Sequence, residues 1–384
     1  MHILIIPSWY PVAQNRMQGI YFKEQAEAVG KYDTSNKVGV ISAASLSIMQ
    51  AFRRKNFRYG VEETVDNNFF ELIFNFPAIP KNKSINKFIA SYMGKKMFLR
   101  YIQEHGLPDI IHLHSFELGD LTVWIKKTYN ISFLYTEHAS AHYYNRLTEK
   151  EEQTMKMIVK YSSSNFAVSQ HLALFLSKKY NANFEMLPNF IDTEFFTCKE
   201  KKKEPIFTFI NIAGLNPGKN HVLLLKTFKN LHIKYPEIKL LIYGEGPTKN
   251  LLYSLAKDLN ILKFVTFGGH IGRQEVKENL CRSHCFVLTS RFETFGVVAI
   301  EAMSCGLPVI TTKNGGTESI VVEDKLGILC EQNEKNLYLA MEKIYLNYKS
   351  YNPTYIKNYI IENFSEKSIV KRLLNVYNET LINK

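Results

Sequence analysis

The chain has 384 residues, more than one ordinary hydrophobic core holds, so we expect two domains. Its composition, 46% hydrophobic and 22% charged, excludes a disordered chain. The formal net charge of +12 suits anionic partners such as nucleotide diphosphates or phospholipids. No nucleic-acid motif accompanies that charge, so we expect no nucleic acid partner.

Short β-rich segments alternate with helical patterns along the chain, which is typical of parallel α/β sheets. In the first half the sequence predicts strands over residues 2–6, 37–41, 109–113, 132–135 and 165–168. In the second half it predicts strands over residues 207–212, 239–243, 264–267, 285–288 and 308–311. After Gly327 it predicts only helices, over residues 334–348, 353–363 and 366–381.

A charged run at residues 199–205, Lys-Glu-Lys-Lys-Lys-Glu-Pro, is typical of a solvated linker. We therefore place a domain boundary between Thr193 and Pro205, with domains over residues 1–195 and 196–365. No apolar stretch is long enough to span a membrane, and the first residues lack the features of a signal peptide. We expect a cytoplasmic protein.

The five cysteines are odd in number and scattered over the second half of the chain, at positions 198, 281, 285, 305 and 330. This pattern predicts reduced thiols and no disulfide framework. Cys281, His284 and Cys285 lie close together, but no second cluster of ligands accompanies them at the spacing of a zinc site. We expect no metal here and interpret these residues as core and helix-end positions.

Two carboxylates, Glu293 and Glu301, lie eight positions apart around Gly296, between predicted strands at residues 285–288 and 308–311. If a helix begins near Gly296, its free amides and dipole favour a phosphate. Glu301 then lies about one and a half turns inside the helix and Glu293 in the loop before it. Carboxylates beside a diphosphate can help by accepting hydrogen bonds from hydroxyl groups. The pattern predicts a nucleotide sugar, with a diphosphate between two polyols.

The run from Ser290 to Ile310, with Glu293-Thr-Phe-Gly-Val-Val-Ala-Ile-Glu301 inside it, resembles the signature of family-4 retaining glycosyltransferases of the GT-B fold. Weaker motifs occur earlier in the chain, in the order typical of the family. They include Ile-Pro-Ser-Trp-Tyr-Pro near the start, Asp109-Ile-Ile-His-Leu-His114, Thr136-Glu-His138 and Gly244-Glu-Gly-Pro247. The start is similar to that of bacterial members that build surface polysaccharides. The resemblance implies two Rossmann-like parallel-sheet domains facing a cleft, with the last helix, residues 366–384, crossing back onto the first domain.

The resemblance also implies roles for particular residues. Glu301 would hold the ribose hydroxyls and Glu293 hydroxyls of the transferred sugar. His138 would face that sugar, and Gly19 would let a loop of the first domain approach the diphosphate. Further donor-binding positions are Thr294, Phe295, Gly296, Val297 and Gly244.

Lys219 is the candidate cation for the leaving diphosphate, because it lies in a loop between a predicted strand and a helix start, where a lysine opposes the helix dipole. The family usually carries an arginine five residues earlier, where this chain has Gly214; Arg291 or Arg273 could compensate. The sequence has no Asp-x-Asp pair to hold a divalent ion, which favours metal-independent catalysis without a cofactor. No nucleophile for a double displacement is evident, so the resemblance implies a same-face mechanism.

The segment 81–100 carries six positive charges and no negative one, and Ile85, Phe88, Ile89, Tyr92, Met93 and Lys96 recur at helical spacing. A second basic run covers residues 53–58. Two interpretations stay open: an ordinary amphipathic helix packed on its sheet, or a patch on the inner membrane surface. The expected partners are a UDP- or GDP-linked sugar and a glycan or undecaprenyl-type lipid-linked acceptor.

Two functions other than glycosyl transfer are alternatives. A nicotinamide oxidoreductase is disfavoured, because Gly244-Glu-Gly246 is followed by Lys249 where the third glycine of a dinucleotide fingerprint belongs. An inactive nucleotide-sugar-binding protein is favoured only by the glycine at position 214.

Overall fold

The computed structural model describes the whole chain except residues 12–18, 47–59, 67, 145, 199–202 and 383–384. The second basic run (53–58) and most of the predicted linker therefore lie outside the described residues. The chain divides into two compact units. Unit 1 comprises Met1–Val168, Ala173–Leu187 and Ile369–Lys384, and unit 2 comprises Ser169–Leu172 and Pro188–Ser368. The sequence predicted boundaries after residues 195 and 365, whereas the two units divide after Leu187 and Ser368, and the assignment of Ser169–Leu172 to unit 2 was not predicted.

Unit 1 is built on a sheet whose described strands lie in the order β3-β4-β2-β1-β5-β6-β7-β8. The strands are β1 (His2–Pro7), β2 (Lys37–Leu46), β3 (Gly60–Asp66), β4 (Phe69–Pro77), β5 (Ile110–His114), β6 (Ser132–Glu137), β7 (Ser164–Ala167) and β8 (Glu185–Met186). All neighbours pair parallel except β3 and β4. Strands β5 and β6 are buried at every position, as expected of central parallel strands covered on both faces.

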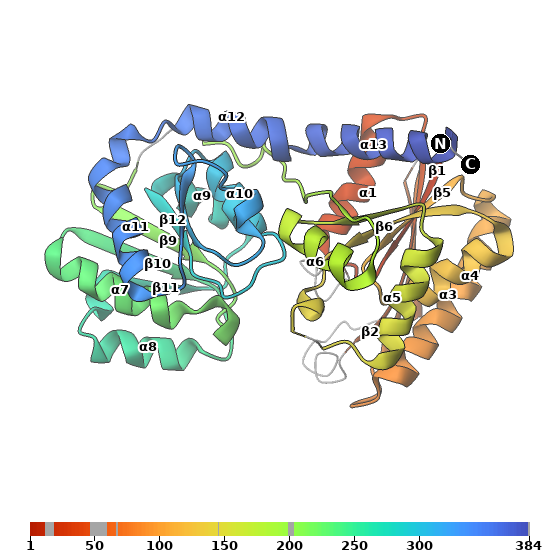
Figure 1. Cartoon of the computed structure of the whole chain (residues 1–384), viewed down its shortest axis with the longest axis horizontal. Coiled ribbons are helices and arrows are strands. Elements are labelled where there is room, and N and C mark those ends of the chain that lie inside the picture. Colours follow the sequence, from red (N-terminus) through yellow and green to blue (C-terminus); the bar gives the residue numbers. More distant parts are fainter. Residues whose placement is uncertain (12–18, 47–59, 67, 145, 199–202, 383–384) are drawn as a thin grey trace. The chain divides into compact units, whose positions relative to one another are not determined.

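Helices connect these strands and cover the sheet (Figure 1). They are α1 (Ile20–Tyr32), α3 (Lys83–His105), α4 (Gly119–Tyr129), α5 (Glu149–Tyr161) and α6 (Gln170–Tyr180). The C-terminal helix α13 (Glu366–Ile382) also contributes, because its residues from Ile369 onward belong to unit 1. Tyr377 of α13 is fully buried, and its hydroxyl lies 2.8 Å from Nδ1 of His112 in β5.

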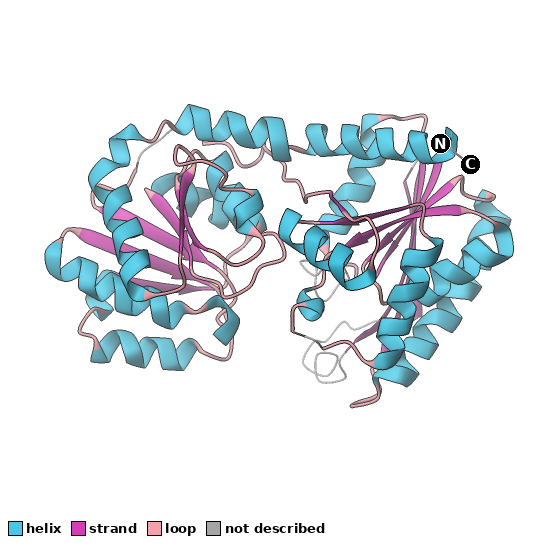
Figure 2. Cartoon of the chain, viewed as in Figure 1, coloured by secondary structure: helices cyan, strands magenta, loops and turns pink. Residues whose placement is uncertain are grey.

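Unit 2 is a second sheet of parallel strands in the order β11-β10-β9-β12-β13-β14. The strands are β9 (Phe207–Ile212), β10 (Ile238–Tyr243), β11 (Val265–Gly269), β12 (Cys285–Leu288), β13 (Val309–Thr312) and β14 (Gly327–Cys330). The helices are α7 (His221–Lys234), α8 (Lys249–Asp258), α9 (Arg273–Arg282), α10 (Val297–Ser304), α11 (Glu334–Asn347) and α12 (Pro353–Phe364). Helices α7, α8 and α11 pack together, as do α9, α10 and α12, so both faces of this sheet are covered (Figures 1 and 2).

The predicted α/β class is confirmed, with three additions. The sequence analysis missed the β3–β4 hairpin at one edge of the unit 1 sheet, whose β3 is antiparallel and mostly exposed. It also missed the two-residue edge strand β8, and β14, a four-residue edge strand, because it predicted only helices after Gly327. The missed strands β3, β8 and β14 lie at sheet edges, where side chains carry a weaker burial pattern than those of central strands.

The expectation that all cysteines are reduced is wrong for one pair. Cys198 and Cys281, separated by 83 positions, form a disulfide, while Cys285, Cys305 and Cys330 are free and buried. The odd number of cysteines was a poor guide, because five cysteines can also form one disulfide and leave three free thiols.

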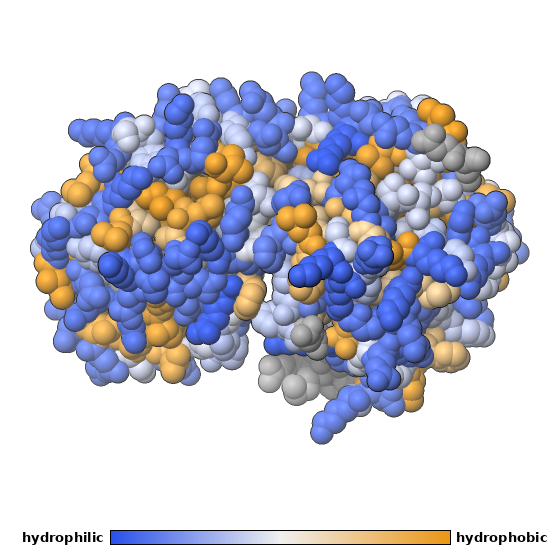
Figure 3. Space-filling model, in the orientation of Figure 1, coloured by the Kyte–Doolittle hydropathy of each residue, from blue (hydrophilic) through white to orange (hydrophobic). Residues whose placement is uncertain are grey.

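No helix in the described residues is both long enough and apolar enough to cross a bilayer. On the face drawn in Figure 3, hydrophobic residues are scattered among hydrophilic ones.

Candidate active site

The order of the strands in unit 2 brings two loops together. The chain goes from β9 outward to β10 and β11, then returns to β12 on the other side of β9. The loops that follow β9 and β12 therefore leave the same edge of the sheet side by side. In α/β folds this topological switch point is where ligands bind.

The loop after β9 carries Lys219. A short 3-10 turn, Pro217–Lys219, is fixed by the side chain of Asn216, which accepts a hydrogen bond of 2.9 Å from the amide of Gly218. Asn220 then adopts a left-handed conformation (φ 52°) and begins α7 without a side-chain cap. The predicted position of Lys219, between a strand and a helix start, is what the structure has.

The loops after β9 and β12 are joined by hydrogen bonds. The hydroxyl of Thr289 donates to the carbonyl oxygens of Lys219 (3.0 Å) and Asn220 (3.2 Å). The amide of Arg291 donates to the carbonyl of Gly218 at 2.8 Å. Arg291 therefore adjoins the Lys219 loop, whereas the guanidinium of Arg273 stacks on Phe195 and Phe196, at 5.0 and 5.4 Å from the ring centroids.

Lys219 and Glu293 form an ion pair, with Nζ 2.5 Å from Oε1. The same carboxylate oxygen accepts a hydrogen bond of 2.6 Å from the hydroxyl of Ser290. The amide of Glu293 donates to the carbonyl of Asn314 at 2.9 Å, which fixes the backbone of the loop. Both side chains remain partly accessible, Lys219 at 26% and Glu293 at 13%, so a ligand can reach them.

Helix α10 begins next to this pair. Gly296 precedes it with φ 106°, and no side chain caps its first turn. A Cβ at Gly296 would lie 2.8 Å from Cγ2 of Thr317, so both conformation and space require glycine. Thr294, Gly296 and Val297 are partly exposed or lie at the helix start, while Phe295 is buried and anchors the turn. Glu301 is the fifth residue of the helix, as predicted, and is partly exposed.

Gly244 supports the site through packing. Its φ is 140°, and a Cβ there would lie 2.0 Å from the carbonyl oxygen of Ala213. The chain after β10 therefore lies directly against the loop that carries Lys219. We interpret Gly244 as a residue that positions the loop.

Sequence reasoning missed Ser290 and Asn314, which hold Glu293 from two sides. Ser290 stands at the start of the signature run, and Asn314 follows β13 closely. A search for polar residues just after predicted parallel strands would have found both, because the carboxyl ends of such strands meet at one edge.

In unit 1, Gly19 has φ 70° and begins α1, and a Cβ there would lie 2.7 Å from the carbonyl oxygen of Trp9. His138 follows β6 and is 8% exposed. Its Nε2 lies 3.0 Å from Nδ1 of His114, and the ring of Phe22 packs against it, with centroids 4.8 Å apart. Its Nδ1 is buried and has no hydrogen-bond partner among the described residues.

Burial keeps the histidines of this cluster neutral. It lowers the pKa of His112 and of His138 to about 3, and lowers the pKa of His114 well below its ordinary value. His138 therefore acts as a neutral hydrogen-bonding group and not as a cation. For Glu137, burial alone would raise the pKa, but His142 and a hydrogen bond from Tyr135 bring it down to about 2.

These pKa values predict acid sensitivity of folding. Below the ordinary histidine pKa of 6.5, these histidines bind protons in the unfolded chain but not in the folded chain. The free energy of unfolding therefore falls as the pH falls from 6.5 toward 3. At pH 5 the loss is up to about 2 kcal/mol for each such histidine. Urea unfolding at pH 7.5 and pH 5 measures it, and His138→Gln should show a smaller loss. A pH-independent free energy of unfolding over this interval would contradict the prediction.

Comparison with known proteins gives the family. Residues 59–195 match the family described as Glycosyltransferase Family 4, and residues 191–361 match the family described as Glycosyl transferases group 1. The chain contains a domain of each of these two glycosyltransferase families and has the GT-B fold. The predicted family-4 and GT-B resemblance is thereby confirmed at this level.

Individual relatives agree with that family. The sequence of one subunit of the Homo sapiens phosphatidylinositol N-acetylglucosaminyltransferase is 27% identical over 299 residues, covering 74% of this GT-B chain. The chain spans 60% of the length of that relative.

Solved structures share the fold of this GT-B chain. Sucrose-phosphate synthase from Thermosynechococcus elongatus has a TM-score of 0.79 at 18% identity, with 100% of both chains covered. The Anabaena protein HepE in complex with UDP has a TM-score of 0.74 at 14% identity, covering 99% of this chain and 100% of HepE.

Proposed function

We propose that this chain transfers a hexose-type sugar from a UDP- or GDP-linked donor to a glycan or lipid-linked acceptor, with retention at the anomeric carbon and without a metal ion. The observation that carries the proposal is the meeting of Lys219, Glu293 and the uncapped first turn of α10 at the switch point of unit 2. In a nucleotide sugar, the cation and the free amides suit the diphosphate, and the carboxylate suits the hydroxyl groups of the sugar.

The ion pair leaves capacity for the donor on both partners. An ammonium has three N–H groups, and the bond to Glu293 uses one. The other two can bind the leaving diphosphate, where negative charge develops as the glycosidic bond breaks. Contacts of Glu293 within the described residues fall on Oε1, so Oε2 can accept hydrogen bonds from sugar hydroxyls. Lys219 thus stands between two anionic groups and screens one from the other.

The proposed chemistry needs no further side-chain base. In a same-face mechanism the leaving phosphate accepts the proton of the acceptor hydroxyl as the new bond forms. The amides at the start of α10 would stabilise the charge left on that phosphate. Glu301 would accept hydrogen bonds from the ribose.

A donor screen tests the function. UDP- and GDP-linked hexoses are added singly in a thermal-shift assay, and each binder is then tested for release of nucleoside diphosphate in the presence of a chelator. We expect one nucleotide class to bind and to be turned over. Binding without release would favour an inactive binding protein, and release only after manganese is added would overturn the metal-free mechanism.

Gly214 offers a gain-of-function prediction. A Cβ at this position meets its nearest atoms at 3.5 and 3.9 Å, which is ordinary contact, so a side chain fits. Gly214→Arg adds a cation on the loop of Lys219, and we expect the KM for the donor to fall several-fold. Gly214→Gln, of similar reach but neutral, is the matched control and should leave KM unchanged. Equal effects of both substitutions would show that charge is not the cause.

We propose that the chain binds an anionic membrane surface through α3, and that this membrane carries the acceptor. The face that α3 buries contains Ala90, Gly94, Met97, Phe98 and Tyr101. The predicted apolar face is a different one: Ile85 is 42%, Phe88 66% and Tyr92 50% exposed. The basic residues of the same helix, such as Lys95 and Lys96, suit phospholipid headgroups. The lipid in the name of the human relative supports a lipid-linked acceptor, and the peripheral inner-membrane location belongs to this proposal.

Vesicle binding checks this surface. Phe88→Ser/Tyr92→Ser should lower co-sedimentation with phosphatidylglycerol vesicles about tenfold, because two exposed aromatic rings no longer insert. Leu251→Ser/Leu346→Ser removes side chains that are 57% and 61% exposed on α8 and α11, and serves as the control. Equal binding of all three proteins would remove α3 from the membrane.

A further inference from the structure

Three cysteines from separate segments of unit 2 meet outside the candidate active site. Cys198 precedes β9, Cys281 lies in α9, and Cys305 directly follows α10. Their Sγ atoms all lie within 4.8 Å of one another. Cys198 and Cys281 are joined as a disulfide, and Sγ of Cys198 lies 3.5 Å from the carbonyl oxygen of Cys305. We call these three residues the thiol cluster.

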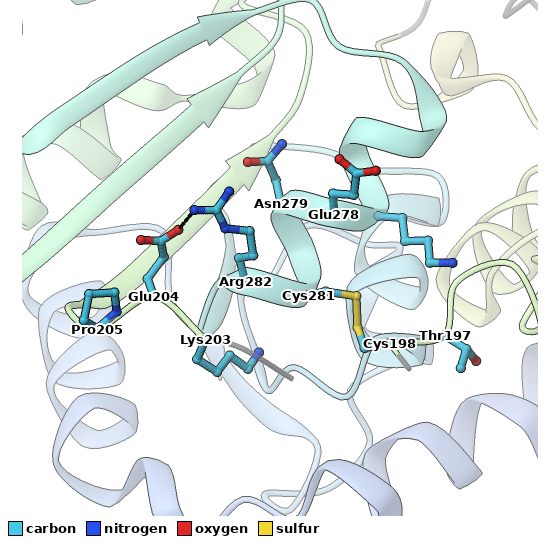
Figure 4. A pocket seen from close by; sticks show the side chains of 10 residues that line it. Thr197, Cys198, Lys203, Glu204, Pro205, Glu278, Asn279, Cys281 and Arg282 are labelled. Carbon is cyan, nitrogen blue, oxygen red and sulfur yellow. Dashed lines mark ion pairs between the residues drawn. A yellow bond between two sulfur atoms is a disulfide. The ribbon is translucent and has the colours of Figure 1, made fainter. Parts of the chain in front are cut away.

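The thiol cluster is open on one side and closed on the other. Cys198 and Cys281 line a cavity of about 630 Å³, together with Lys203, Lys277 and Arg282 (Figure 4). Cys305 is only 3% exposed, and its Sγ lies 3.8 Å from the carbonyl oxygen of Phe196. Small solutes can therefore reach two of the sulfurs from the cavity, while the third sulfur approaches them from the protein interior.

Reduction of the disulfide would leave three thiols converging on one point. In a tetrahedral zinc–thiolate site the metal–sulfur distance of about 2.3 Å places the sulfurs about 3.8 Å apart. The spacing in the thiol cluster is within reach of this value. We propose that the reduced thiol cluster binds a thiophilic divalent cation, Zn²⁺, through Cys198, Cys281 and Cys305, with water from the cavity as the fourth ligand.

The surroundings suit such a site. Cys305 is buried, so its sulfur would be shielded from bulk water on the side away from the cavity. Three thiolates and one Zn²⁺ carry a net charge of −1, which the cavity can offset, because its lining has three cations against two carboxylates: Lys203, Lys277 and Arg282 against Glu204 and Glu278.

The disulfide is then the metal-free, oxidised state of the same site. The thiolates of Cys198 and Cys281 give two electrons to hydrogen peroxide, which takes up two protons from solvent and leaves as two water molecules. The two sulfurs join, Zn²⁺ departs, and the thiolate of Cys305 takes back a proton. Cys305 itself keeps its oxidation state, which agrees with its burial and with its free thiol in the structure.

Metal titration of the full chain tests the proposal. The protein is reduced with a phosphine, freed of metal with a chelator, and titrated with Co²⁺ as a spectroscopic substitute for Zn²⁺. We expect one Co²⁺ per chain with intense sulfur-to-metal charge-transfer absorption, and a rise in the melting temperature with Zn²⁺. One equivalent of peroxide should then release the metal and lower the titratable thiols from five to three.

Single substitutions assign the ligands. Cys305→Ser keeps the two cysteines that form the disulfide and should weaken Co²⁺ binding at least tenfold. Cys198→Ser should also weaken Co²⁺ binding at least tenfold, and it changes only a half-buried position. Cys330→Ser, a buried free cysteine in β14, is the matched control and should bind as the natural chain does. Circular dichroism checks the fold of each variant. Absence of Co²⁺ binding by the reduced chain, or full binding by folded Cys198→Ser, would overturn the proposal.

Discussion

Lys219→Ala is expected to lower kcat for sugar transfer by about 10²–10³-fold, the effect typical of removing one fixed group that stabilises developing charge. Lys219 lies in the loop after β9 and pairs with Glu293 in the loop after β12, which leads into α10. Without it, the leaving diphosphate would face Glu293 with no positive side chain between them. Steady-state release of nucleoside diphosphate measures the change, with the donor at saturating concentration.

Lys226→Ala is the matched control for this substitution. Lys226 lies on α7, in the same region of sequence, and its ion pair with Glu334 at 3.9 Å joins two half-exposed side chains. Its loss should leave kcat within about twofold, because exposed ion pairs contribute little. If Lys219→Ala behaves like Lys226→Ala, Lys219 has no part in the transfer.

Glu293→Gln is expected to lower kcat by about 10²-fold, although it preserves shape. The amide can still accept a hydrogen bond from Ser290, but it no longer holds the ammonium of Lys219 by charge, and sugar hydroxyls donate less strongly to it. Both the cation and the sugar would lose part of their orientation. The same release assay gives the magnitude, and Glu334→Gln is the control of equal chemistry.

A double-mutant cycle separates a joint role from two independent ones. Because Nζ of Lys219 and Oε1 of Glu293 are 2.5 Å apart, the two substitutions should not add, and Lys219→Ala/Glu293→Gln should be little slower than Lys219→Ala alone. Strict multiplication of the two effects would mean that the ion pair has no importance for transfer.

Much of the central architecture was predictable from local sequence. The predicted bounds of β9 and β12 agree with the structure, because each is a short apolar run of a buried parallel strand. The order of the strands in the sheet, in contrast, was not predictable from local sequence. No local pattern says that β12 returns to lie beside β9, and this return is what brings Lys219 to Glu293 across 74 positions.

The sequence predicted in which loop or helix start each candidate site residue lies, but not the contacts between these residues. Lys219, Glu293 and Gly296 were each assigned to a loop or helix start, and the structure has them there. Their ion pair, and the support from Ser290 and Asn314, depend on distances between loops that only the folded sheet determines. The Cys198–Cys281 disulfide was missed for the same reason, since its partners lie 83 positions apart on segments with no shared motif.

Unit 1 is completed by the last residues of the chain. Tyr377 in α13 fills its core and contacts His112, and residues from Ile369 onward belong to it. During synthesis on the ribosome, residues 1–187 emerge long before this segment exists, and unit 2 is translated in between. The core of unit 1 therefore lacks Tyr377, next to a buried histidine, until α13 has been translated, so this unit is completed only after unit 2 has been synthesised.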